Sequence, residues 1–304
     1  MGRRKKGRNV SGWLVLDKPV GLTSTHAVSR VRRLFDAKKA GHAGTLDPLA
    51  SGILPIALGE ATKTVPYVMD GEKRYLFTVR WGIETTTDDT EGEATERSAI
   101  RPSHDAILSR LPQFVGTIDQ VPPTFSAKRV DGERAYDLAR DGETVELDAS
   151  QVEIHDIVYL GSPDEDRAMF EAHCGKGTYV RALARDMGRA LGCFGHITSL
   201  RRTQVGPFNE DDLVTLEDLE TMEEPQERDV FLAPMDNALS DLPVISVVPG
   251  DAAKLRRGMS LLIRGPDAPP NGEEAYAMDG DDLVAIGVMD YGKFQPKRVM
   301  VPDA

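Results

Sequence analysis

The chain has 304 residues, which exceeds one ordinary domain and predicts one large domain with a smaller one attached. Its composition, 40% hydrophobic and 28% charged, is that of a globular protein, and no apolar run approaches the length of a membrane span. The net charge of -12 argues against a nucleic-acid-binding protein, but residues 1–80 hold 15 Lys and Arg against 6 Asp and Glu. Because affinity for a polyanion depends on local fields, this basic N-terminal part is compatible with RNA binding, although a basic tail and solvated helix faces explain it equally well.

The N-terminus is basic over residues 1–9, and no apolar stretch of signal-peptide length follows, so a cytoplasmic protein is expected. Two cysteines are too few for a disulfide framework. Residues 173–174 and 193–196 could in principle supply four ligands to a zinc ion. His173 and Cys174 are neighbours on an expected strand and would point to opposite sides of it. We therefore expect buried free thiols and no bound metal.

The first expected element is a buried strand over residues 12–16, which ends at a turn rich in proline and glycine. Thr23 or Ser24 is placed to cap a helix whose exposed face is rich in arginine. A glycine-rich loop over residues 41–52 comes next, and an apolar helix or strand follows at residues 53–58.

The middle of the chain alternates apolar and other residues over Lys73–Trp81, which predicts a half-buried strand. Residues 84–98 are acidic and threonine-rich and are expected to form a loop, and a short helix is expected at 103–111. Residues 120–145 are irregular and basic, and we expect an arm that orders on a partner. Further strands are expected at residues 152–159 and 169–173.

A helix is expected over residues 178–191, because its apolar residues fall on one stripe and Gly192 is placed to stop it. Arg181, Arg185 and Arg189 recur every four residues and share another face, which on spacing could simply be solvated. The acidic residues 209–229 are also interpreted as a solvated face. Short β-like pieces after residue 242 suggest a β-rich appendage. The expected organisation is a basic disordered tail (1–10), a main domain (11–240) and a small C-terminal domain (241–304).

Several common active-site motifs fail when tested against the sequence. Residues 175–178 lack the lysine–serine/threonine order and the preceding glycine of a phosphate-binding loop. No dinucleotide-binding glycine motif follows a strand, and no nucleophile elbow is present. What remains is Asp47, which stands before Pro48 in the glycine-rich loop. An isolated Asp-Pro pair is usually only a turn starter.

Six segments in order along residues 10–205 resemble the successive motifs of the TruB family of pseudouridine synthases. They are residues 12–21, 40–52, 58–63, 73–75, 174–181 and 199–202. The resemblance implies an α/β (α+β) catalytic domain on a mixed, mainly antiparallel sheet, with a small β-rich PUA-like domain at the C-terminus. It also implies conversion of uridine to pseudouridine at position 55 in the T loop of tRNA, by a cytoplasmic monomer that needs no cofactor, membrane or protein partner.

By this resemblance Asp47 is the nucleophile, and a carboxylate can carry the isomerisation through a covalent intermediate. The residues leave two routes open, attack on C6 of the base or on C1′ of the ribose. Arg181 is implied to pair with Asp47 and keep it ionised. Tyr75 is implied to stack on the flipped base and to help move a proton, although an alternating strand would equally place it in a core.

The remaining implied substrate-binding residues are Tyr179 and Leu200 as pocket walls, and His42, which intrudes into the T loop. Candidate contacts to RNA phosphates are Lys18, Lys63, Lys128, Arg129, Arg201 and Arg202. Two other functions are alternatives to tRNA modification: a tRNA-binding or folding chaperone that needs no chemistry, and a synthase acting on another RNA.

Overall fold

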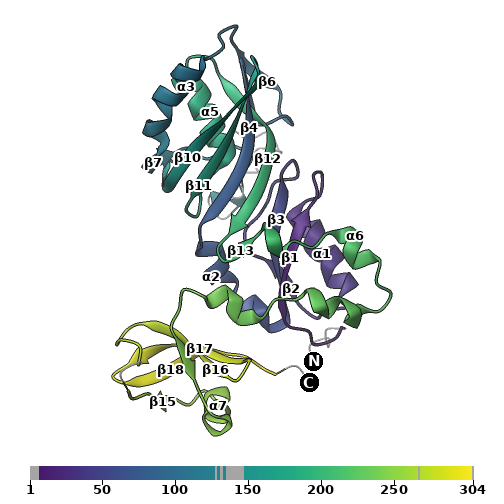
Figure 1. Cartoon of the computed structure of the whole chain (residues 1–304), viewed down its shortest axis with the longest axis vertical. Helices are drawn as coiled ribbons and strands as arrows, with labels where there is room; N and C mark the ends of the chain where they lie inside the picture. Colours follow the sequence, from purple (N-terminus) through teal and green to yellow (C-terminus); the bar gives the residue numbers. More distant parts are fainter. Residues whose placement is uncertain (1–6, 127–128, 131–132, 135–146, 266–267, 303–304) are drawn as a thin grey trace.

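The computed structural model describes residues 7–126, 129–130, 133–134, 147–265 and 268–302. Figure 1 shows three parts of the chain from top to bottom: a tall end of a large sheet, the end of that sheet that carries β1–β3, and a separate small sheet. No described helix has both the length and the apolar character needed to cross a membrane.

Among the described residues, nine strands form the central sheet, in the order β1-β3-β12-β4-β11-β10-β7, with β2 beside β3 and β13 beside β12. Their bounds are β1 (Gly12–Lys18), β2 (Ala40–His42), β3 (Ser51–Leu58), β4 (Lys73–Trp81), β7 (Gly116–Gln120), β10 (Ser150–Asp164), β11 (Arg167–Cys174), β12 (Gly195–Val205) and β13 (Phe208–Asn209). The pairings are antiparallel except that between β3 and β12, which is parallel. This confirms the expected mixed, mainly antiparallel sheet.

Helices α1, α3, α5 and α6 lie over one face of this sheet, with α3 and α5 at its tall end and α1 and α6 near β1–β3 (Figure 1), whereas Val68 of α2 packs with Trp13 and Val15 on the opposite face. The helices are α1 (Ser24–Leu34), α2 (Val65–Asp70), α3 (His104–Arg110), α5 (Val180–Ala190), α6 (Leu216–Glu220) and α7 (Pro249–Arg256). Short 3-10 helices span Gly59–Lys63, Leu111–Phe114, Glu210–Asp212, Pro225–Phe231 and Met235–Leu239. Thr23 caps α1 by accepting a hydrogen bond from the His26 N–H, as the sequence predicted.

One continuous core lies between the helices and the sheet, and residues from α1, β4, β11, α5 and β12 all contribute to it. Alternation along β4 places Phe77, Val79 and Trp81 in this core, as the sequence predicted for this strand. The same side of β4 carries Tyr75, which packs against the edge of the core.

The C-terminal sheet contains β14 (Val244–Ser246), β15 (Leu261–Leu262), β16 (Glu274–Asp279), β17 (Asp282–Asp290) and β18 (Lys293–Val299), in the order β14-β16-β17-β18-β15. It has its own apolar cluster, packed under α7. Side-chain contacts tie it to the rest of the chain: the Tyr67 hydroxyl donates to Glu274 Oε1 at 2.6 Å, and Lys63 Nζ donates to the Val299 carbonyl at 2.6 Å. The expected β-rich C-terminal part is therefore present.

One local expectation was wrong. The acidic segment 84–98 is not only a loop, because it contains a short hairpin of β5 (Ile83–Thr85) and β6 (Ala94–Arg97). Residues 209–229 form several short helical turns, because capping residues such as Thr215 start a new turn and Pro225 interrupts the chain. In the expected arm, β8 (Arg129–Val130) pairs with β9 (Glu133–Arg134), and much of the rest lies outside the described residues, as do residues 1–6 of the basic tail.

Candidate active site

Asp47 lies on the loop between β2 and β3, and the start of α1 holds this loop in place. The buried Ser24 hydroxyl accepts a hydrogen bond from the Leu46 N–H at 2.8 Å and donates one to the Leu46 carbonyl at 2.9 Å. The Gly21 N–H donates to the Pro48 carbonyl at 2.7 Å. These bonds fix the backbone on both sides of Asp47, whose side chain is 33% exposed and accessible to a ligand.

Arg181 is the cation closest to the Asp47 carboxylate. Its Nε lies 2.8 Å from Asp47 Oδ2, although the N–H is not aligned for a hydrogen bond, so the contact is an ion pair. The two terminal nitrogens donate to the carbonyls of Thr87 and Phe125, each at 2.9 Å. Because these bonds orient the buried guanidinium, it meets Asp47 in a fixed position.

A second carboxylate shares Arg181. Asp89 is almost completely buried, and its Oδ2 lies 3.5 Å from Arg181 Nη1. The arginine therefore lies between two carboxylates, one exposed to a ligand and one buried behind it. Sequence reasoning missed Asp89, because the segment 84–98 was interpreted only as an acidic loop. The sequence signal that could have identified Asp89 is the opposite charge of that acidic segment and the arginines of α5.

The arginine stripe of α5 is not a solvated face. Arg185 Nη1 lies 3.0 Å from Asp88 Oδ2, and Arg189 pairs with Glu84 through two hydrogen bonds of 2.7 and 2.8 Å. Burial raises the pKa of Asp88 to about 6, and Arg185 opposes that shift. The stripe anchors the acidic segment onto α5 and so positions the residues that hold Arg181.

Tyr75 and Arg202 lie beside this ion pair. They are register partners on β4 and β12, and the Tyr75 hydroxyl interacts with the guanidinium. Arg202 is 2% exposed and donates to the carbonyls of Ile53 (2.8 Å), Gly44 (3.2 Å) and Thr45 (3.4 Å). It therefore fastens both ends of the Asp47 loop to the sheet.

Close approach of β3 to Arg202 depends on glycine. Gly52 has a φ of +94°, and a Cβ added there would lie 2.3 Å from the Arg202 carbonyl oxygen. Gly52 thus has a packing reason, since the parallel pairing of β3 with β12 leaves no space for a side chain at this position.

The expectation that Lys18 and Arg202 contact RNA phosphates is wrong. Lys18 is fully buried, and its ammonium group donates to the carbonyls of Leu22 (2.8 Å), Pro19 (2.9 Å) and Pro48 (3.5 Å). Burial lowers the Lys18 pKa to about 8, while the nearby Asp47 charge opposes the shift. Both side chains support the Asp47 loop from inside the protein.

The other residues implied by the resemblance are placed as follows. Tyr179 precedes α5, where its backbone exchanges hydrogen bonds with the Gln120 side chain, and burial raises the pKa of its half-buried hydroxyl. Leu200 lies opposite Phe77 in the core and is 7% exposed. His42 is a partly exposed residue of β2, paired with Ile56.

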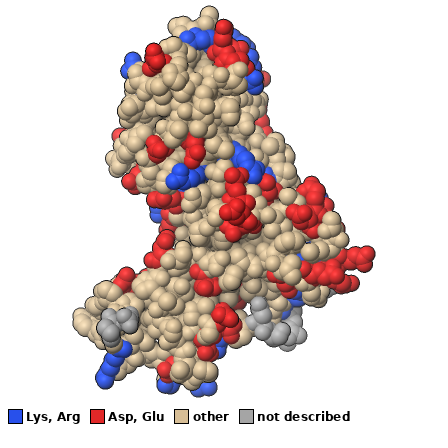
Figure 2. Space-filling view, viewed as in Figure 1, with Lys and Arg blue, Asp and Glu red and all other residues tan. Residues whose placement is uncertain are grey.

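Two of the candidate phosphate contacts are paired with acids. Lys63 contacts Glu60, and Arg201 pairs with both Asp17 and Glu210. Lys128 and the Arg129 side chain lie outside the part of the structure that is described. Figure 2 shows acidic side chains gathered over the region of α6 and blue side chains scattered among red ones on this face. On this face the basic areas are small and lie among acidic side chains.

Both cysteines are free and buried, and burial raises the pKa of each thiol to about 11, so they are poor nucleophiles and poor metal ligands. His196 is also buried and its Nδ1 lies 2.8 Å from the Ile83 carbonyl. Within the described residues, Cys174, Cys193 and His196 do not gather into a possible metal site.

The chain is similar to known proteins over nearly its whole length. Residues 32–180 match the model described as "TruB family pseudouridylate synthase (N terminal domain)". Residues 181–240 match "tRNA pseudouridylate synthase B C-terminal domain". The chain is 59% identical to tRNA pseudouridine synthase B of Agrobacterium fabrum, over 98% of this chain and 96% of that protein. It is 57% identical to the protein of the same name from Bradyrhizobium diazoefficiens, over 97% and 87%.

Solved structures give the same fold. The chain is similar to one in "Crystal Structure of a Cbf5-Nop10-Gar1 Complex", with a TM-score of 0.69 and 26% identity over 95% of this chain and 84% of that one. A chain in "Structure of H/ACA RNP bound to a substrate RNA containing 2'-deoxyuridine" has a TM-score of 0.72 and 24% identity, over 100% and 92%. At this identity the second likeness supports the fold.

Proposed function

Because the chain belongs to the TruB family of pseudouridylate synthases, we propose that it isomerises uridine 55 of the tRNA T loop to pseudouridine. The observation that carries the proposal is the Asp47–Arg181 ion pair, in which a buried, oriented cation holds an accessible carboxylate beside Tyr75. The relatives at 57–59% identity are named for action on tRNA, and the chain spans nearly all of each of them.

The proposed reaction uses Asp47 as a covalent nucleophile. After the carboxylate attacks, the C–N glycosidic bond of the extruded uridine breaks, the base turns, and C5 bonds to C1′ of the same ribose. The bond to Asp47 then breaks, C5 loses a proton and N1 gains one, so substrate and product are isomers and no redox partner or phosphate donor is needed. Attack on C6 of the base and attack on C1′ of the ribose both place a carboxylate oxygen on the substrate. In either route Arg181 holds the Asp47 carboxylate in position for attack.

The walls of the pocket are assigned by the same reasoning. Tyr75 stacks on the flipped base, and Tyr179 and Leu200 enclose it. His42, which lies on β2 just ahead of the Asp47 loop, enters the space that the base leaves in the T loop. Lys18 supports the loop from below and is not assigned to the RNA.

We further propose that the chain binds the T arm of tRNA and acts as a cytoplasmic monomer. Residues 11–240 form the catalytic domain and residues 241–304 a PUA-like domain.

The direct test of the proposed reaction is incubation of unmodified tRNA with the wild type and with Asp47→Ala, followed by mapping of pseudouridine. We expect no product from Asp47→Ala. Asp105→Ala, in the exposed first turn of α3, is the matched control and should behave as wild type. Wild-type activity in Asp47→Ala would overturn the assignment.

A tRNA-folding activity is the second candidate, and it is compatible with the same surface. Asp47→Ala separates the two, because it removes the nucleophile and leaves the buried supports of its loop in place. If refolding of a misfolded tRNA is equal with wild type and Asp47→Ala, the chain acts on RNA folding independently of the chemistry.

A further inference from the structure

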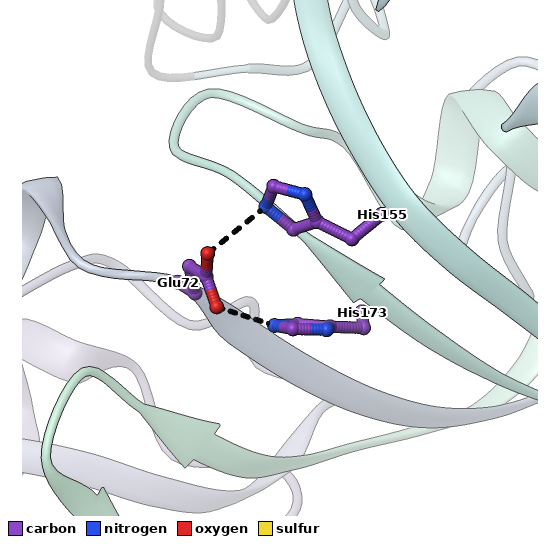
Figure 3. A group of neighbouring side chains, drawn as sticks. All are labelled: Glu72, His155 and His173. Carbon is purple, nitrogen blue, oxygen red and sulfur yellow. Dashed lines mark hydrogen bonds and ion pairs between the residues drawn. The ribbon is translucent and has the colours of Figure 1, made fainter. Parts of the chain in front are cut away.

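Two histidines and a glutamate converge on the side of the central sheet that the catalytic residues do not use (Figure 3). Glu72 precedes β4, His155 lies on β10 and His173 on β11. Arg74 is the register partner of His173, whereas Tyr75 is that of Ala172, one residue along each strand. Since successive side chains alternate between faces, this cluster and Tyr75 lie on opposite faces of the sheet.

The three side chains point their ligand atoms at one another. The Nε2 atom of His173 lies 2.7 Å from Glu72 Oε2, and the Nε2 atom of His155 lies 3.3 Å from Glu72 Oε1. One ligand atom from each residue lies within 4.8 Å of the other two. In a tetrahedral zinc site, bonds of about 2.0–2.2 Å place neighbouring ligands about 3.3 Å apart. The longest separation must therefore shorten by roughly 1.5 Å, which rotation of partly exposed side chains can provide.

A β-bulge brings His155 into this group. The register of β10 against β11 shifts between Ile154 and Asp156, so that His155 is the extra residue opposite His173. Bulges of this kind redirect a side chain away from the regular pleat. The two imidazole rings lie with centroids 4.8 Å apart and planes tilted by 52°, so both present the same nitrogen to Glu72 without stacking face to face.

A second carboxylate lies behind one of the histidines. Glu153 Oε1 is 3.8 Å from His155 Nδ1, on the side of the ring away from Glu72. Metal-binding histidines usually have such an outer partner, which fixes the ring orientation and makes the ligating nitrogen more basic. At 3.8 Å the contact is an ion pair, and a small movement of the exposed Glu153 side chain would bring it to hydrogen-bond distance.

We propose that Glu72, His155 and His173 bind one divalent transition-metal ion of the zinc type. Imidazole and carboxylate ligands suit Zn²⁺, and three protein ligands leave a position for water. The Glu72 side chain is 55% exposed, so that position is open to solvent. The ion joins the start of the strand that carries Tyr75 to two neighbouring strands, and it braces this end of the sheet without touching the catalytic face.

The test measures metal binding and needs no RNA, so its outcome is independent of the proposed function. Tag-free protein treated with a chelator is titrated with Zn²⁺ by calorimetry and with Co²⁺ by visible absorption. We expect one saturable site per chain, Co²⁺ bands typical of nitrogen and oxygen ligands, and a higher melting temperature with Zn²⁺. His155→Ala and His173→Ala should each abolish these signals, while activity on tRNA stays within about twofold in metal-free buffer.

Two variants make the result specific. His104→Ala removes an exposed histidine elsewhere and should bind metal as the wild type does. Glu153→Gln keeps all three ligands and should weaken Zn²⁺ binding about tenfold, the usual effect of losing an outer partner. Absence of saturable binding in the wild type overturns the proposal, as does binding that survives in the His155→Ala/His173→Ala double variant.

Discussion

Tyr75 and Arg202 are opposite one another on β4 and β12, and the hydroxyl of the tyrosine interacts with a guanidinium that also holds the nucleophile loop. One buried arginine thus connects the two groups that must meet the same uridine. It is a positioning residue, since its nitrogens are occupied by protein oxygens and it is 2% exposed.

We expect Arg202→Met to destabilise the protein and to slow turnover. The change leaves the buried carbonyls of Gly44, Thr45 and Ile53 without their donor, at about 1–3 kcal/mol for each group that water does not reach. Urea unfolding and single-turnover kinetics measure the two effects. Arg201→Met, in which the lost partners are surface carboxylates, is the control and should cost less than about 1 kcal/mol. Equal losses in both variants would contradict a special role for Arg202.

Tyr75 variants separate the ring from the hydroxyl. Tyr75→Leu removes both and should reduce turnover far more than tRNA binding, whereas Tyr75→Phe keeps the stacking surface and should lose less. Burial raises the pKa of Tyr75 despite the opposing Arg202 charge, so the phenol stays protonated through ordinary buffers. Its contribution to stability is complete below the unfolded pKa of about 10 and is lost as pH rises from there through the folded pKa. Parallel losses of binding and turnover in Tyr75→Leu would argue against stacking and proton transfer.

Deprotonation of Lys18 should lower the activity of the enzyme at basic pH and so give the plot of activity against pH a basic limb. Its folded pKa is about 8, so the positive charge beside Asp47 disappears above that pH, and we expect activity to fall by less than about tenfold. Lys18→Met should be slower at pH 7 but lack this limb. Lys73 also has a pKa lowered to about 8 by burial, and Lys73→Met is the control that should keep the limb.

The same ionisation has a defined sign in stability. The folded pKa of Lys18, about 8, lies below the ordinary lysine value of 10.5, so the unfolded state binds more protons between pH 8 and 10.5. The contribution of Lys18 to the free energy of unfolding therefore increases over that range, by at most about 1.4 kcal/mol per pH unit. The comparison to measure is wild type against Lys18→Met, and a difference independent of pH would contradict the lowered pKa.

Tyr67→Phe tests how firmly the C-terminal sheet is attached. The variant loses the hydrogen bond to Glu274 and should reduce the free energy of unfolding by about 1 kcal/mol, since the pair is partly exposed. Calorimetry is expected to show a broader transition as the two parts unfold less cooperatively. Tyr291→Phe, on an exposed turn of the C-terminal sheet, should leave the transition unchanged.

Affinity for tRNA should depend steeply on salt. The surface is acidic overall, so binding relies on small basic areas whose attraction is screened within about 10 Å at 0.1 M salt. Filter binding between 50 and 200 mM salt measures the slope. Affinity that does not change over this range would contradict an electrostatic contribution.

Patterns of short range were predicted well from the sequence, because alternation and capping act within a few residues. The strand at Lys73–Trp81 and the Thr23 cap are examples. The role of Asp89 was missed, because its segment was expected to be only an acidic loop. The expected roles of Lys18 and Arg202 were wrong, because a lysine or arginine is expected on the surface until its burial is known. The β-bulge at His155 has no sequence signal that would distinguish it from a regular strand residue.

The parallel pairing of β3 with β12 also bears on how the protein is made. The donor to the Gly44 carbonyl lies 158 residues later in the chain, and Arg181 also follows Asp47 at a long distance in sequence. Such remote contacts form slowly, because a large loop must close before they give any stabilisation. During synthesis the contacts from Ser24, Gly21 and Lys18 can form early, but a nascent chain that ends before residue 202 lacks the arginine that holds the carbonyls of Gly44 and Thr45. We therefore expect the growing protein to gain the proposed activity only when its catalytic part is nearly complete.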